Sequence, residues 1–306
     1  MEGITDSVYR EVVTDHCPGW DVLACDFLRV PNAGHYPIKH LVAHMGDRFL
    51  NDESLNQKTM YQILTSSRAY TVDMVKRLDQ IGVKWVDLNL GCPSNTVCRN
   101  GGGSFLLKDL LTLERIVKDV RQNFKGHFSC KVRVGWADGG NFSDTIKLLN
   151  DCGVELITVH GRTREMMYKE PAQWQWISEA VKVSRVPIIG NGDIWSAQDA
   201  KRMLEETGCH AVMVARGALK TPWMPFHYYQ NLPDTQESRL EMSRLFLGHY
   251  RDKLAVLKVS ERGLTKQLKS VTRYMFDELS EGTGLRRSVL LSQSSAEIMS
   301  HIQNFA

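Results

Sequence analysis

Short, continuous apolar runs recur along the chain, and most are followed by a polar or glycine-containing turn and then by a helical pattern. The runs are "WDVLACDFL", "TMYQILTS", "KWVDLNLG", "FSCKVRVG", "VELITVHG", "VPIIGNG" and "HAVMVARG". Strands that are buried on both faces of a parallel sheet are typically apolar throughout rather than alternating. A polar residue near the end of each of the last six runs gives a series with separations of 27, 42, 29, 31 and 25 residues: Gln62, Asn89, Lys131, His160, Asn191 and Arg216. These separations are close to the roughly 30 residues of a βα unit, so the sequence predicts an α/β fold with a parallel sheet.

Two architectures accommodate such a sheet, an open doubly wound sheet and a closed (β/α)8 TIM barrel. The barrel is favoured because polar residues stand near the carboxyl end of at least six strands, where barrel enzymes carry their chemistry. An open sheet would concentrate these residues at one switch point. Only seven strands are visible, and "MEGITDSVYREVV" has the pattern of a loop and helix that follow a strand. We therefore expect the first barrel strand to lie upstream of Met1.

The β pattern stops after residue 232, which predicts a barrel over residues 1–232 and an all-helical domain over residues 239–306. Residues 1–238 carry 27 basic and 28 acidic groups, whereas residues 239–306 carry 11 and 7, a net charge of +4. On a helical wheel, an apolar stripe formed by Leu264, Leu268, Val271 and Met275 lies opposite a cationic side formed by Lys258, Arg262, Lys266, Lys269 and Arg273. Exposed helix faces are often charged, so a solvated surface fits this pattern too. The near absence of acidic residues among the cations is the argument for a nucleic-acid surface.

Two glycine-containing loops follow the last two predicted strands, "GNGDI" at 190–194 and "ARGAL" at 215–219. In a barrel, the corresponding loops commonly bind a phosphate group through backbone N–H groups. We therefore expect a phosphate-bearing ligand near Arg216, with Lys131 and His160 directed toward the same ligand.

Cys92 lies between a glycine and a proline at the end of a predicted strand. The following proline favours an extended backbone at this cysteine, and a thiol that is protonated at neutral pH can donate a proton. The seven cysteines are odd in number and scattered, which indicates a reduced, cytoplasmic protein without a metal site. No apolar run approaches the roughly 20 residues of a membrane span, and the first residues do not resemble an export signal.

Several of these segments, in this order and spacing, resemble the tRNA-dihydrouridine synthases. They are "MEGITDSVYR", "YQILTS", "DLNLGCPSNTV…GGGSFLL", "KVRVGW", "VHGRT", "GNGDIW" and "ARGAL". The resemblance covers essentially the whole chain, including the helical region. "DFLRV" and the "GW" after "KVRV" are most similar to the C subfamily, which modifies uridine 16.

The resemblance implies an FMN enzyme that takes electrons from NADPH or NADH and passes a hydride to C6 of a uracil in tRNA. Cys92 would protonate C5 as the general acid. The expected cofactor contacts are Met1, Glu2, Gln62, Lys131, His160, Asn191, Gly192, Asp193, Ala215 and Arg216. The residues expected to read the uracil are Asn89, Arg133 and Tyr168, and those expected to contact tRNA are Arg29, Arg262, Lys266, Lys269 and Arg273. A monomer is expected.

The chain departs from the family pattern where Ala215 replaces the first glycine of a Gly-Arg-Gly segment. Its N–H group is retained, so phosphate binding is still expected. A dihydroorotate dehydrogenase-like flavoprotein and a non-catalytic RNA-binding relative are the alternatives. The first would not need a cationic helical region, and the second would not need Cys92 and the phosphate loops. A metal-dependent aldolase is less consistent with strand ends that carry Lys, Asn and His singly.

Overall fold

The computed structural model describes residues 3–232, 234–276 and 282–305. The predicted cofactor contacts Met1 and Glu2 therefore lie outside the described residues. The chain separates into two compact units. The barrel unit comprises Val22–Asp193 and Asp199–Met213, and the helical unit comprises Met1–Asp21, Ile194–Gln198 and Val214–Ala306.

The barrel unit is built on one parallel sheet. Its strands are β1 (Leu23–Ala24), β2 (Leu28–Arg29), β3 (Thr59–Leu64), β4 (Trp85–Leu90), β5 (His127–Arg133), β6 (Leu156–His160), β7 (Ile188–Asn191) and β8 (Ala211–Met213). The order is β1-β3-β4-β5-β6-β7-β8, and β2 also pairs with β3. The first predicted run therefore forms two short segments against one neighbour. Within the described part of the chain, no further strand joins β8 to β1.

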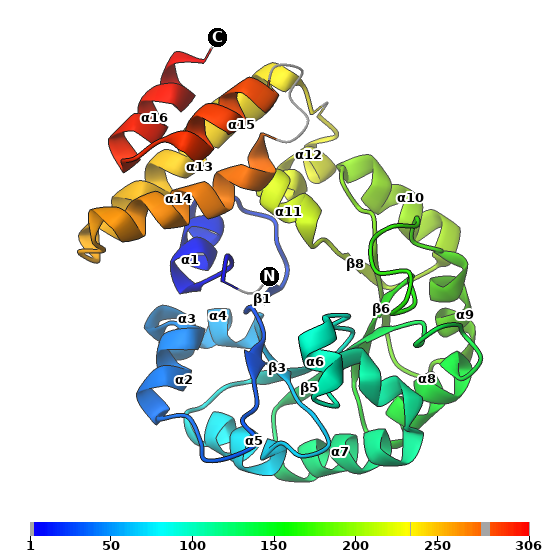
Figure 1. Ribbon diagram of the computed structural model, residues 1–306. Coiled ribbons are helices and arrows are strands. Elements are labelled where there is room, and N and C mark those ends of the chain that lie inside the picture. Colours follow the sequence, from blue (N-terminus) through cyan, green and yellow to red (C-terminus); the bar gives the residue numbers. More distant parts are fainter. Residues whose placement is uncertain (1–2, 233, 277–281, 306) are drawn as a thin grey trace. The chain divides into compact units, whose positions relative to one another are not determined.

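Helices cover the outside of this curled sheet (Figure 1). They are α2 (Ile38–Met45), α3 (Asp47–Asn51), α4 (Glu53–Gln57), α5 (Thr71–Gln80), α7 (Leu110–Asn123), α8 (Phe142–Asp151), α9 (Gln175–Val183) and α10 (Ala197–Thr207). Two short elements, α6 (Asn95–Arg99) and the 3-10 helix η1 (Gly103–Lys108), lie between β4 and α7 along the chain. Helix α7 shows why these segments are helical: Asp109 caps its first turn, and Leu113, Ile116, Val117 and Val120 form one buried face. Strand and helix alternate as predicted, and the fold is of the TIM-barrel class.

The register of the sheet places polar side chains in rows across neighbouring strands. Gln62, Asp87 and Ser129 are aligned, and so are Asn89, Lys131 and Thr158. Aligned residues of a parallel sheet point to the same face. Residues of the opposite face alternate with these rows and are apolar and fully buried, as Leu88 and Ile157 are. The sheet therefore has a polar inner face and an apolar outer face under the helices.

The helical unit contains the last helices of the chain and also its first. They are α1 (Ser7–His16), α11 (Arg216–Lys220), α12 (Met224–Gln230), α13 (Gln236–Val256), α14 (Glu261–Met275), α15 (Gly282–Leu291) and α16 (Ser295–Asn304). Helix α1 packs on α13, where the rings of Tyr9 and Phe246 lie 5.4 Å apart and Lys253 pairs with Glu11 at 2.5 Å. The proposed domain boundaries at 1–232 and 239–306 remain a prediction.

Helix α14 has the two faces that the sequence predicts, except that Lys258 is not part of it: the helix begins at Glu261, and Lys258 precedes it with φ 54°. Leu264, Leu268, Val271 and Met275 are buried. Arg262, Lys266 and Arg273 are exposed, and Lys269 is partly exposed. None of the helices in the described ranges is both long enough and apolar enough to cross a membrane.

Candidate active site

Cys92 follows β4 and precedes the short helix α6. It is partly exposed, whereas the other six cysteines are buried. Its carbonyl oxygen accepts hydrogen bonds from the backbone N–H of Ser104 at 3.2 Å and from the Ser104 hydroxyl at 2.9 Å. Gly103 has φ +57°, and a Cβ atom there would lie 2.9 Å from the same carbonyl oxygen. The glycine run after α6 therefore allows the chain to pack closely against the backbone of Cys92.

Arg133, at the end of β5, joins the Cys92 loop to the loop that follows β6. Its Nε atom donates to the carbonyl oxygen of Gly91 at 2.9 Å, and its Nη1 atom donates to the carbonyl oxygens of Thr163 at 2.8 Å and Met167 at 3.1 Å. The guanidinium also lies over the ring of Tyr168, 5.3 Å from its centre. Arg133 is 1 % exposed and Tyr168 is 52 % exposed, so the tyrosine presents its ring at the surface above a fixed arginine.

Gln62 and Asn89 meet inside the barrel unit. The Asn89 amide donates to Gln62 Oε1 at 2.8 Å, and Asn89 Oδ1 accepts from the backbone N–H of Gly91 at 3.0 Å. Two residues that the sequence assigned to the cofactor and to the uracil are thus hydrogen-bonded to each other and to the residue before Cys92.

Lys131 lies next to Thr158 in the register of β5 and β6. Burial, with a smaller contribution from Arg133, lowers the pKa of Lys131 to about 8, and Asp87 acts in the opposite direction. The Oγ1 atom of Thr158 is buried and has no hydrogen-bond partner among the described residues. Buried polar groups nearly always have partners. The inner face at Lys131 and Thr158 therefore suits a polar ligand, and these donors fit the oxygen-rich and nitrogen-rich ring and ribityl chain of a flavin.

His160 and Asp193 are linked through Arg162, a buried residue that sequence reasoning did not assign. Arg162 Nη1 lies 3.2 Å from His160 Nε2, and Arg162 Nη2 donates to the Asp193 carboxylate. Asp193 also accepts from the backbone N–H of Ala172 at 2.8 Å. The "VHGRT" motif contains this arginine and was the signal that could have identified it.

The loop after β7 is held by these contacts and by two further hydrogen bonds. Trp174 Nε1 donates to the carbonyl oxygen of Gly192 at 2.9 Å, and Asn191 Nδ2 donates to the carbonyl oxygen of Met213 at 2.7 Å. Gly192 has φ +118°, and a Cβ atom there would lie 2.8 Å from the His160 ring. Only glycine therefore fits at this position of the predicted phosphate loop.

The other predicted contacts are divided between the two units. Arg29 ends β2, with its guanidinium 5.9 Å from the centre of the Phe27 ring. Ala215 and Arg216 belong to the helical unit, where the Arg216 guanidinium lies 4.6 Å from the centre of the Trp195 ring. The remaining predicted tRNA contacts are on α14 in the same unit, namely Arg262, Lys266, Lys269 and Arg273.

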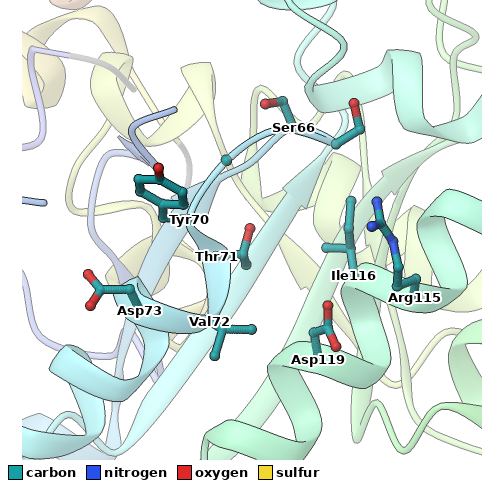
Figure 2. A pocket seen from close by; sticks show the side chains of 10 residues that line it. Ser66, Tyr70, Thr71, Val72, Asp73, Arg115, Ile116 and Asp119 are labelled. Carbon is teal, nitrogen blue, oxygen red and sulfur yellow. The ribbon is translucent and has the colours of Figure 1, made fainter. Parts of the chain in front are cut away.

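A separate cavity of about 250 Å³ lies between the loop after β3, the start of α5 and α7. Figure 2 shows Ser66, Tyr70, Thr71 and Asp73 on one side and Arg115, Ile116 and Asp119 on the other. None of the predicted site residues lines this cavity, so it is distinct from the Cys92 loop. Across the described ranges, no group of three or more His, Cys, Asp or Glu side chains could hold a metal ion.

Comparison with known proteins identifies the family. The chain is 32% identical over 311 residues to the tRNA-dihydrouridine(16) synthase of Escherichia coli (strain K12), covering 99% of this chain and 96% of that protein. It is 30% identical over 306 residues to the enzyme of the same name from Cupriavidus necator, covering 97% and 93%. It is also 32% identical over 225 residues to the probable tRNA-dihydrouridine synthase 1 of Synechocystis, where the match spans 73% of this chain and 61% of that protein.

Solved structures support the fold. An old yellow enzyme homologue from Zymomonas mobilis matches with a TM-score of 0.50 and 11% identity, covering 76% of this chain and 85% of that one. The dihydrouridine synthase family model matches residues 1–302. The chain is therefore an enzyme of the dihydrouridine synthase family.

Proposed function

We propose that this chain reduces a uridine of tRNA, at position 16, to 5,6-dihydrouridine, with FMN as the flavin, NADPH as the reductant and Cys92 as the proton donor. The observation that carries the proposal is the state of Cys92. It is the partly exposed cysteine, and its backbone is fixed by Ser104 and, through Gly91, by Arg133. The similarity over nearly the full length to relatives named for position 16 supports the choice of that uridine.

The polar inner face of the barrel unit is the place for the flavin. Gln62 and Lys131 would hold the ring and ribityl region, with the buried hydroxyl of Thr158 as a further partner. In the barrel unit, the loop from Asn191 to Asp193 and the neighbouring His160 would bind the phosphate group through N–H donors. When bound, the flavin would supply the hydride that goes to C6 of the uracil.

The residues of the chain do the remaining chemistry. Asn89, Arg133 and Tyr168 would orient the uracil, and Tyr168 offers an exposed aromatic face for stacking. The Cys92 thiol would give its proton to C5, which completes saturation of the C5–C6 bond, and the resulting thiolate would recover a proton from water. Arg29 and the cationic side of α14 would contact tRNA phosphates.

The purified protein should be yellow, should release FMN on denaturation, and should turn colourless with NADPH in the absence of oxygen. With added unmodified tRNA it should then form dihydrouridine, mapped by reverse transcription after alkaline cleavage or by mass spectrometry of nuclease fragments. Dihydrouridine at another position would contradict the assignment to position 16. A colourless protein that does not take up added FMN would contradict the cofactor.

A further inference from the structure

A chain of hydrogen bonds, buried at its centre and partly buried at its two ends, crosses the inner face of β3, β4 and β5 and ends at Gly91. Trp85 Nε1 donates to the Ser129 hydroxyl at 2.9 Å, and this hydroxyl donates to Asp87 at 2.6 Å. Gln62 Nε2 donates to the other Asp87 oxygen at 2.7 Å. Gln62 Oε1 then accepts from Asn89, whose Oδ1 accepts from the backbone N–H of Gly91.

The carboxylate of Asp87 fixes the direction of every bond between it and Gly91. An ionised carboxylate can only accept, so Gln62 must turn its NH₂ group toward Asp87. The amide oxygen of Gln62 then faces Asn89, which must present its own NH₂ group. This leaves Asn89 Oδ1 for the N–H of Gly91. The opposite orientation of either amide would place two donors or two acceptors face to face.

The surroundings of Asp87 support this role. Asp87 and Ser129 are fully buried, and Gln62 and Asn89 are 8 % exposed. Burial raises the pKa of Asp87 above its ordinary value, and the hydrogen bonds from Ser129 and Gln62 and the charge of Lys131 oppose this rise by favouring the carboxylate. The Trp85 N–H can only donate, so the Ser129 proton is left for the carboxylate.

We propose that Asp87 is a positioning residue that orients the Gln62 and Asn89 amides and thereby holds Gly91, the residue before Cys92, in place. The hydrogen-bond relay stands on the contacts above, and its consequence for Cys92 rests on the proposed function. The relay predicts that the Gly91 N–H depends on a carboxylate that is three hydrogen bonds away, through the side chains of Gln62 and Asn89.

Asp87→Asn tests the relay because it preserves shape and removes the acceptor-only group. If the oxygen of the new amide accepts from Ser129, its NH₂ group faces Gln62. Gln62 must then turn its amide oxygen toward residue 87, and Asn89 must turn its own amide oxygen toward Gln62. Asn89 would then present NH₂ to the N–H of Gly91. Two donors, the Asn89 NH₂ group and the Gly91 N–H, would then face each other. We expect this donor–donor contact at Gly91, which is partly exposed to water, rather than at Ser129, which is fully buried. The Ser129 hydroxyl could instead donate its proton to the Met60 sulfur, which lies 3.8 Å away. The variants are therefore made in a Met60→Leu background, which removes this acceptor and nearly preserves the side-chain volume.

The readout is hydrogen exchange of the Gly91 amide, followed by NMR in the flavin-free protein. Relative to Met60→Leu alone, adding Asp87→Asn should speed exchange at least about fivefold, the factor equivalent to about 1 kcal/mol for a broken hydrogen bond. Adding Asn89→Asp as well should restore the slow exchange, because the carboxylate then stands next to Gly91 and the whole relay runs in the reverse direction. The proposal is overturned if Asp87→Asn does not speed hydrogen exchange at Gly91. It is also overturned if adding Asn89→Asp does not restore slow hydrogen exchange.

Ser129→Ala is the matched control, since it removes a bond to Asp87 but leaves the direction of the relay unchanged. It should leave exchange at Gly91 within about twofold of the parent. An equal acceleration in Ser129→Ala would reduce the effect to general loosening and overturn the proposal. If Asp87→Asn does not fold, Gln62→Met interrupts the relay at its centre, and slow Gly91 exchange in that variant would count against the proposal.

These measurements do not depend on enzymatic activity. If the exchange results hold while the protein forms no dihydrouridine, the relay stands and the proposed function fails. If the protein forms dihydrouridine and exchange is insensitive to Asp87, the function stands and the relay fails. In the active enzyme, Asp87→Asn should lower kcat for uridine reduction. The double variant with Asp87→Asn and Asn89→Asp should not restore kcat, because Asn89 is also placed at the uracil.

Discussion

The Nε atom of Arg133 donates a hydrogen bond of 2.9 Å to the carbonyl oxygen of Gly91, the residue that precedes Cys92. The same guanidinium bonds two carbonyl oxygens of the loop after β6. Arg133→Lys keeps the charge but offers a single ammonium group, which cannot reach three separated carbonyls. The variant should lose at least about 2 kcal/mol in the free energy of unfolding, because buried hydrogen bonds to charged groups are worth about 1.5 to 3 kcal/mol each.

Urea denaturation measures that decrease. The rate at which iodoacetamide alkylates Cys92, measured on the peptide that contains this residue, reports whether the loop has changed. The rate at Cys92 should change in Arg133→Lys. The exposed Arg115 provides the control, and Arg115→Lys should leave both quantities unchanged. A stability of Arg133→Lys within about 0.5 kcal/mol of the parent would mean that the three bonds do not support the loop.

Cys92→Ala should separate the two halves of the proposed reaction. Reduction of a bound flavin by NADPH needs no proton donor at the uracil, so this step should keep its parental rate. Formation of dihydrouridine should slow by about 10² to 10⁴, the usual contribution of general acid catalysis. Stopped-flow absorbance follows the first step, and nucleoside analysis of the tRNA follows the second.

Cys98→Ala is the control for this prediction. Cys98 lies in the same loop region, but it is buried, with its sulfur 3.5 Å from the Ser104 hydroxyl. It should remain active in both steps. Parental uridine reduction by Cys92→Ala would show that the proton comes from another group.

The parallel sheet and the cationic helix could be predicted because local patterns encode them. Continuous apolar runs of the right spacing gave the strands from β3 to β8, and a wheel of 100° per residue gave both faces of α14. The first predicted run was less accurate, since it forms the two short segments β1 and β2.

The relay inside the barrel could not be predicted, because it depends on register. Gln62, Asp87 and Ser129 are aligned only after three strands pair, and nothing local links residues 25 and 42 positions apart. The contact between Arg162 and Asp193 likewise joins two loops that are 31 residues apart in the sequence. The apolar outer face of the strands dominated their composition and concealed the polar inner face.

The cationic side of α14 should bind tRNA phosphates. Among the described residues, Lys266, Lys269 and Arg273 form no ion pair with an acidic side chain. The nearby carboxylate of Glu261 is occupied by the backbone N–H and hydroxyl of Ser295, at 2.6 and 3.1 Å. Changing the three cations together to Ala should weaken tRNA binding. The slope of log affinity against log salt should fall by about one unit for each phosphate that the variant no longer neutralises.

Filter binding over a range of salt concentrations measures this slope, and NADPH oxidation by the flavin should stay intact. A matched control removes three exposed cations that are paired with acidic residues in the barrel unit, namely Lys118, Lys182 and Arg185. The control should retain the parental slope. Equal effects of the two triple variants would mean that α14 contributes only general charge.

Lys131 should make the stability of the flavin-free protein rise with pH. Burial, aided by Arg133 and opposed by Asp87, lowers its pKa to about 8 from an ordinary value of 10.5. Between these two values the unfolded chain binds more protons than the folded chain, so the free energy of unfolding increases with pH in this window. The increase should reach up to about 3 kcal/mol and should be absent in Lys131→Met. Urea unfolding from about pH 7 to about pH 10 measures it, with exposed Lys125→Met as the control that should keep the parental rise.

Saturating FMN should reduce the rise, because an anionic or hydrogen-bonding ligand beside Lys131 favours the ammonium and returns its pKa toward the ordinary value. A parental protein whose stability does not rise relative to Lys131→Met would show that the ammonium is solvated, and a rise that persists with bound FMN would place the cofactor away from Lys131.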